Sequence, residues 1–185
     1  MRLITQQAQS FAEIQEYVVS GSLDLFRSYG LAVEHSFGTA RVEIEGPAVM
    51  AVIGFAAATV RGAVLLLTSR AVVATLQPAE IRTPRPNEDT LRDVLGEFSN
   101  MLIGRVKNQL VTRNVAPLVA TPTTIFGDHL TLPAPTSGMS AWHKFASPVG
   151  DLFVRLDATF EKEFALDPVD GGAAAPLTEG DMTLF

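Results

Sequence analysis

Three polar side chains of one predicted helix have the residue types and the spacing to assist a hydrolysis. They are Asp93, Glu97 and Asn100, and the last two lie three residues apart, which makes them neighbours on a helix surface. The Asn100 amide carries a donor and an acceptor and stays neutral, so it can orient a water but cannot act as a strong base. The Glu97 carboxylate can pair with a lysine of another molecule. Such a pair suits a reaction whose main electrostatic stabilisation comes from a partner.

The helix that must position these side chains is predicted over residues 88–110. Apolar residues recur there at the spacing of one helix face, namely Leu91, Leu95, Phe98 and Leu102. On the opposite face, polar or small residues fall within roughly 60° of one another. These residues are Asp93, Glu97, Asn100 and Gly104. Lys107, near the end of the same side, is expected to be a solvated lysine.

Two glycines, Gly96 and Gly104, flank this polar face. Each glycine in a helix interior costs about 1 kcal/mol relative to alanine. We therefore expect something to come close to the face. The alternative is a solvated face with no role, which is the usual meaning of a short Glu-x-x-Asn pattern.

Composition narrows the possible functions. The chain has 185 residues, 47% of them hydrophobic, a net charge of −6 and no cysteine. The charge argues against a nucleic-acid partner, and the absence of cysteine excludes disulfides and thiol catalysis. Three histidines are scattered without ligand spacing, so no metal site is expected.

The most apolar region, residues 48–67, is broken by Arg61 between glycines and predicts two buried strands rather than a membrane span. A cytoplasmic protein is expected.

The order of predicted elements repeats after about 75 to 80 residues. A helix at 5–29, ending at Gly30, precedes a strand at 35–45 and paired strands at 49–55 and 63–67. A short helix at 70–76 follows. The helix at 88–110 then precedes extended chain at 115–126 and paired strands at 139–145 and 151–160. This pattern predicts an α/β fold, an α+β two-layer sandwich in which two long helices cover one face of a mixed sheet with a pseudo-two-fold repeat.

The domain is predicted to span residues 1–165. Residues 166–185 are rich in glycine, alanine, proline and acid and predict a flexible tail. Its last residues, 181–185, regain hydrophobic side chains and could form a docking end. A tail without any role is the alternative.

The segment 93–104, Asp-Val-Leu-Gly-Glu-Phe-Ser-Asn-Met-Leu-Ile-Gly, resembles the signature helix of the CheC/CheX/FliY chemotaxis phosphatases. That motif is Asp or Ser, three residues, Glu, two residues and Asn, and Asp93, Glu97 and Asn100 match it. The form Gly-Glu-x-x-Asn-Met-x-x-Gly is especially similar to CheX. The resemblance covers residues 5 to about 160.

The resemblance implies a phosphatase that acts on the phosphoaspartate of a CheY-like response regulator. Glu97 would pair with the regulator's lysine, and Asn100 would position the attacking water. Asp93, Gly96 and Gly104 would border the docked partner. The partner would bring its own Mg²⁺, so no cofactor of this chain is expected. The family also implies a homodimer, and no nucleic acid or membrane is expected as a partner.

One active site per chain is expected. In the first helix the region Phe-Ala-Glu-Ile-Gln-Glu, residues 11–16, places Glu16 where an asparagine would be needed, and a second carboxylate would repel a phosphoryl group. The alternative function is a non-catalytic docking or scaffold module of the same fold that binds a response regulator or a motor component.

Overall fold

The computed structural model describes residues 2–37, 42, 44, 46–78, 82–131 and 138–168, with side chains in the first helix from Gln6 onward. Two long helices and one short helix accompany the sheet in this part of the chain. The helices are α1 (Arg2–Ser28), α2 (Arg70–Thr75) and α3 (Glu88–Val111). The strands are β1 (Glu34–Phe37), β2 (Ala48–Ala56), β3 (Val60–Ser69), β4 (Leu118–Val119), β5 (Thr123–Gly127), β6 (Met139–Ser147) and β7 (Gly150–Phe160).

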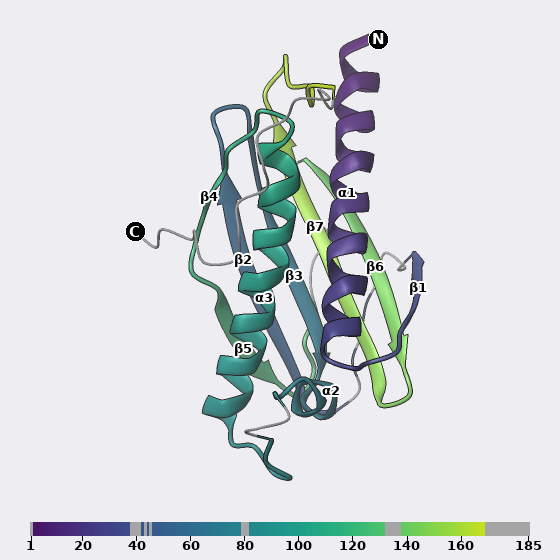
Figure 1. Ribbon diagram of the computed structural model, residues 1–185, viewed down its shortest axis with the longest axis vertical. Helices are drawn as coiled ribbons and strands as arrows, with labels where there is room; N and C mark the ends of the chain where they lie inside the picture. The colour runs from purple at the N-terminus through teal and green to yellow at the C-terminus, as the bar shows by residue number, and fades with distance from the viewer. Residues whose placement is uncertain are drawn as a thin grey trace.

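The strands form one sheet in the order β1-β6-β7-β3-β2-β4, and β5 also pairs with β2. Figure 1 shows α1 and α3 side by side on one face of this sheet, which confirms the predicted two-layer sandwich. The prediction of a mixed sheet is wrong, because every pairing of the described strands is antiparallel. Each hairpin pairs its own strands antiparallel, and the two hairpins meet across β3 and β7 in opposite directions.

The two halves exchange strands. β1 of the first half pairs with β6 of the second, and β4 and β5 of the second half pair with β2 of the first. The order of strands therefore reads the same from either edge once equivalent strands are matched, which confirms the pseudo-two-fold repeat. Neither half can complete its share of the sheet alone, so the described chain forms a single unit.

Two buried serines set the correspondence between the long helices. The Ser22 hydroxyl donates to the Val18 carbonyl and the Ser99 hydroxyl donates to the Leu95 carbonyl, each at 2.7 Å. Ser22 and Ser99 are 77 positions apart (99 minus 22), within the predicted period. The pattern of buried residues follows the same offset, since Ile14, Val18 and Leu25 match Leu91, Leu95 and Leu102.

This offset corrects the comparison of the two helices. On α1 the positions equivalent to Asp93, Glu97 and Asn100 are occupied by Glu16, Ser20 and Leu23. Placing Glu16 opposite Asn100 implies an offset of 84 positions (100 minus 16), which is seven too many. Seven residues are about two helical turns, so the apolar pattern alone cannot distinguish the two alignments.

The core lies between the helices and the sheet. Phe26 of α1 contacts Phe98 of α3 and Phe145 of β6, with ring centroids 5.1 and 5.3 Å apart. The predicted interruption of the first apolar stripe at residues 20–22 does not break α1. Instead, Gly21 lies where α3 packs, and a Cβ there would be 3.3 Å from Leu102 Cδ1. This glycine allows the two helices to approach each other closely.

Local capping signals bound the helices, and Gly30 follows the end of α1 as the sequence predicts. Gly30 has a φ of +72°, and the amides of Gly30 and Leu31 donate to the carbonyls of Arg27 and Phe26, as in a Schellman motif. The Ser69 side chain caps α2 and the Asn87 side chain caps α3 by accepting from the Thr90 amide at 2.8 Å. No described helix is long and apolar enough to cross a membrane.

The other face of the sheet carries a smaller cluster. Met50, Leu65, Leu67 and Trp142 are buried there together with Val42 and Ile44. Of the predicted strand at 35–45, β1 covers residues 35–37, while residues 38–41, 43 and 45 lie outside the described part. Residues 132–137, which precede β6, also lie outside it.

The last described residues pack onto the ends of both long helices. Phe164 and Leu166 are buried in the main core. The Arg113 guanidinium donates to the Tyr17 hydroxyl at 2.9 Å, to the Glu13 carboxylate at 2.6 Å and to the Asp167 carbonyl. The folded chain therefore extends at least to Asp167. Residues 169–185, which hold most of the predicted tail, lie outside the described residues.

Candidate functional site

The predicted site residues all lie on the outward side of α3. Asp93 and Glu97 are exposed, and Asn100, Gly96 and Gly104 are half-buried. Because a helix sets the relative positions of its own side chains, the structure brings these five residues together as the spacing predicts. They form a ridge over the middle of α3, on the side opposite its buried residues.

Burial of the opposite side fixes the orientation of this ridge. Eight residues of α3 are buried against the sheet, α1 or both: Leu91, Leu95, Phe98, Ser99, Leu102, Ile103, Val106 and Leu110. Rotation of the helix would expose this set, and each large apolar side chain contributes about 1.5–3 kcal/mol when fully buried. The core thus holds Asn100 and Glu97 toward solvent.

The two glycines of the ridge have no packing role among the described residues. There, a Cβ at Gly104 would meet no heavy atom within 4 Å, and one at Gly96 would make only an ordinary contact of 3.8 Å with Pro122 Cγ. Neither has a positive φ that would favour glycine. Gly21 differs, since its Cβ would press on Leu102. The fold explains Gly21 but not Gly96 or Gly104, although each glycine weakens the helix by about 1 kcal/mol.

Tyr29, just after α1, borders the ridge on the α1 side. Its hydroxyl donates to Met101 Sδ at 3.5 Å, and its ring lies 5.7 Å from that of Phe98. Burial, and after it the negative charge of Glu97, raises the pKa of the Tyr29 hydroxyl above its ordinary value. The sequence did not single out Tyr29, because nothing local indicates that residue 29 reaches α3.

Arg92 borders the ridge on the opposite side, next to β5. Its guanidinium lies 5.4 Å from the centre of the Phe126 ring and pairs with Asp89 at 2.5 Å. Arg70 lies over the same ring at 5.1 Å and pairs with Glu88 at 2.7 Å. Sequence reasoning missed Arg92, because the helical period does not reveal that β5 runs beside α3.

Within the described residues, no group of three or more His, Asp or Glu side chains could hold a metal ion. The fold does bring two of the scattered histidines together. His35 of β1 and His143 of β6 lie on neighbouring strands, with Nε2 of His35 3.2 Å from Nδ1 of His143. β1 and β6 form one edge of the sheet, on the side of α1 that is away from α3 (Figure 1).

Comparison with protein families finds one match to this chain. The family model described as Chemotaxis phosphatase CheX matches residues 49–146, which is more than half of the chain. The chain belongs to the CheX family. The matched region runs from β2 to β6 and contains all five residues of the α3 ridge. No curated protein sequence matches the chain.

Solved structures share the fold. A chemotaxis protein CheX from Desulfovibrio desulfuricans is 19% identical with a TM-score of 0.66, and the match covers 80% of this chain and 99% of that one. A CheX from Vibrio vulnificus is 20% identical with a TM-score of 0.67 and the same coverage of 80% and 99%. The CheX in a CheX–CheY–BeF3–Mg²⁺ complex from Borrelia burgdorferi is 16% identical with a TM-score of 0.61, covering 77% and 96%. These similarities support the α+β fold.

Proposed function

We propose that this CheX-family protein accelerates hydrolysis of the phosphoaspartate of a CheY-like response regulator, with one active site per chain. The observation that carries the proposal is the α3 ridge. Glu97 and Asn100 project outward between two glycines, at which a Cβ would meet no described atom more tightly than an ordinary van der Waals contact. A ridge cleared in this way suits a surface that enters the active site of another protein.

In the proposed reaction, Asn100 orients a water molecule toward the phosphorus. The water oxygen bonds to phosphorus while the bond from phosphorus to the aspartyl oxygen breaks. The products are inorganic phosphate and the free aspartate carboxylate, and the proton lost by the water passes to the phosphate or to solvent. A hundredfold acceleration by this orientation corresponds to about 2.7 kcal/mol. The partner would hold Mg²⁺, which neutralises charge on the phosphoryl oxygens.

Glu97 would hold the two proteins in register by pairing with the partner's lysine. Its exposure suits an intermolecular contact, since no ion pair within the described part of the chain occupies it. Asp93 lies one turn earlier on the same exposed side. The two glycines leave room for the partner's loops on either side of Asn100.

Two observations support the proposed partner and stoichiometry. A structural neighbour from Borrelia burgdorferi is a CheX bound to CheY, BeF3 and Mg²⁺, although it is only 16% identical. On α1, the positions equivalent to Glu97 and Asn100 are Ser20 and Leu23. Neither a carboxylate nor an amide stands there, so a second site on α1 is not proposed.

The test is phosphate release from a phosphorylated regulator of the same organism. We expect Asn100→Ala to reduce the rate by about a hundredfold, equivalent to the 2.7 kcal/mol above. Glu97→Gln should weaken binding of the regulator. The matched control is Glu16→Gln, which removes an exposed carboxylate from α1. If Asn100→Ala released phosphate as fast as the unchanged protein, the proposed mechanism would be wrong.

The alternative is a docking module that binds a regulator or motor component without catalysis. It predicts saturable binding with no acceleration of phosphate loss. A homodimer and a cytoplasmic location also belong to the proposal, both inferred from the family. Sedimentation equilibrium of the full chain would test the dimer, and a concentration-independent monomer mass would reject it.

A further inference from the structure

Electrostatics pose a difficulty for the α3 ridge. The proposed substrate is a phosphoryl group beside carboxylates that bind Mg²⁺, which is an anionic site. The ridge itself carries two carboxylates, Asp93 and Glu97, and the whole chain has a net charge of −6. Like charges slow association and disfavour docking. A cation near Asn100 would oppose this repulsion.

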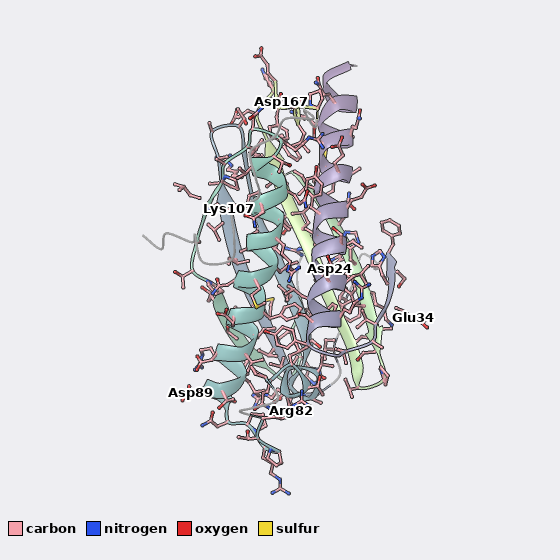
Figure 2. All side chains as sticks on the ribbon, viewed as in Figure 1. Asp24, Glu34, Arg82, Asp89, Lys107 and Asp167 are labelled. Atoms are coloured by element: carbon pink, nitrogen blue, oxygen red, sulfur yellow. The ribbon has the colours of Figure 1, made fainter. Side chains whose placement is uncertain are left out.

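Two cations bracket Asn100 on the same side of α3. Arg92 precedes it by eight residues and Lys107 follows it by seven. At 1.5 Å per residue, they lie about 12 and about 10 Å from Asn100 along the helix axis. Figure 2 shows Asp89, the ion-pair partner of Arg92, near one end of α3 and Lys107 near the other, on the side turned away from α1.

Different charges lie next to Asn100 toward β5 and toward α1. At about 100° per residue, Arg92 is rotated about 80° from Asn100 and Lys107 about 20°, both toward β5. Glu97 is rotated about 60° the other way, toward Met101, which contacts Tyr29. Asn100 thus lies between Glu97 on the side toward α1 and the two cations Arg92 and Lys107 on the side toward β5.

Arg92 is held in place without being buried. Its guanidinium stacks over Phe126 at 5.4 Å and pairs with Asp89 at 2.5 Å, while its side chain remains 47% exposed. Asp89 is 82% exposed, so this pair is screened and weak. A guanidinium has five N–H donors, and a single carboxylate does not use them all. Arg92 is therefore ordered but still able to meet an anionic partner.

We propose that Arg92 and Lys107 form a cationic flank that orients the phosphorylated partner on α3. The flank faces the anionic rim of phosphoryl group and Mg²⁺-binding carboxylates, while Glu97 faces the partner's lysine. The partner then docks in the one orientation that places its phosphorus over Asn100. Arg92 and Lys107 are positioning residues, and neither touches the reacting atoms. This inference rests on the proposed function.

The experiment measures association of the full chain with a CheY-like regulator loaded with beryllofluoride and Mg²⁺, at low and at near-physiological ionic strength. The variants are Arg92→Gln, Lys107→Gln and the double variant. The matched control for each single variant is Arg27→Gln, which removes one positive charge from α1. Arg27 is 78% exposed and pairs with Asp24 at 2.9 Å, also three residues away. Thermal unfolding of each variant checks that the fold is kept.

We expect the double variant to associate about three- to tenfold more slowly at low salt and to show a flatter salt dependence. In phosphatase assays its KM should rise while kcat stays near that of the unchanged protein. Arg27→Gln should change none of these quantities. If the flank variants and Arg27→Gln had the same association rate and the same salt dependence, the proposed flank would be rejected. That conclusion holds whether or not the chain is catalytic.

The binding arm separates this inference from the proposed catalysis. If the unchanged chain binds the loaded regulator but releases no phosphate, the phosphatase proposal fails and the association rates still decide the flank. If every variant associates with the regulator as fast as the unchanged chain and releases phosphate with the same KM, only the flank fails. If the chain does not bind the loaded regulator at all, both are rejected.

Discussion

Protonation of one buried histidine should make the stability of this protein depend on pH. His143 of β6 is 1% exposed, and its ring lies against those of His35 and Phe37. Nδ1 of His143 shares a hydrogen bond with His35, but Nε2 is buried and has no hydrogen-bond partner among the described residues. Burial, and after it the charge of His35, lowers the pKa of His143 to about 4.

The sign and size follow from linkage between protonation and folding. In the unfolded chain the ring has its ordinary pKa of 6.5, so between that value and about 4 the unfolded state binds more protons than the folded state. The contribution to stability is complete above pH 6.5 and is lost as the pH falls toward about 4. At 1.36 kcal/mol per pKa unit, the loss approaches about 3 kcal/mol. Burial also lowers the pKa of His35, which acts in the same direction.

Urea unfolding at several pH values between about 7 and about 4.5 would measure this loss. Between those two pH values, the free energy of unfolding of the unchanged protein should fall by most of the about 3 kcal/mol because of His143. His143→Leu should lack this part of the fall. The free energy of unfolding at neutral pH should change less, because replacing the imidazole by an apolar side chain also removes the buried nitrogen that has no hydrogen-bond partner. His129→Leu is the control, since His129 is exposed. If His143→Leu kept the full pH dependence of the unchanged protein, the reasoning would be refuted.

Three further predictions concern the helices and the tail. Gly104→Ala should stabilise the protein by about 1 kcal/mol, because the site is open, whereas Gly104→Leu should fold normally but bind a loaded regulator at least about tenfold more weakly. Retained binding in Gly104→Leu would count against the docking ridge. Gly21→Leu should destabilise the protein by about 1–3 kcal/mol or more, since a Cβ at this position would already lie 3.3 Å from Leu102 Cδ1. Chemical unfolding measures this change. A neutral result would contradict the close packing of the two helices. Deleting residues 169–185 tests the predicted docking end: weaker regulator binding with unchanged stability supports tethering, and unchanged affinity rejects it.

The parts of the fold that depend only on residues close together in the chain could be predicted from the sequence. The apolar spacing from Leu91 to Leu102 predicted both the helix and its buried side, and all of that set is buried. Gly30 marked the end of the first helix because its conformational preference acts within a single turn of chain. The repeat of helix, strand and hairpin was visible for the same reason.

The site was also predictable in position, because its residues share one helix. Spacing alone places Asp93, Glu97 and Asn100 on one side of α3. What surrounds them was not predictable. Tyr29 reaches the ridge through the packing of α1 on α3, and Arg92 is ordered by Phe126 of β5. These contacts join residues far apart in the chain, and no local pattern indicates them.

The correspondence between residues of α1 and residues of α3 also could not be predicted from the sequence. A shift of about two helical turns leaves the apolar pattern nearly unchanged, so the sequence places Glu16 opposite Asn100. The buried pair Ser22 and Ser99 shows that Leu23 is the equivalent residue. The sheet was expected to be mixed, and strand exchange between halves made it antiparallel among the described strands.

By itself, the sequence determined the ridge of α3, with its Glu-x-x-Asn pattern and two glycines, because helical geometry converts spacing directly into position. Only the tertiary structure decided that Gly21 is needed for packing while Gly96 and Gly104 are not. It also decided that His35 meets His143 and that Arg92 lies over Phe126 of β5. The physical reason is that strand pairing and helix packing are long-range choices, made by burial of the whole core rather than by any one segment.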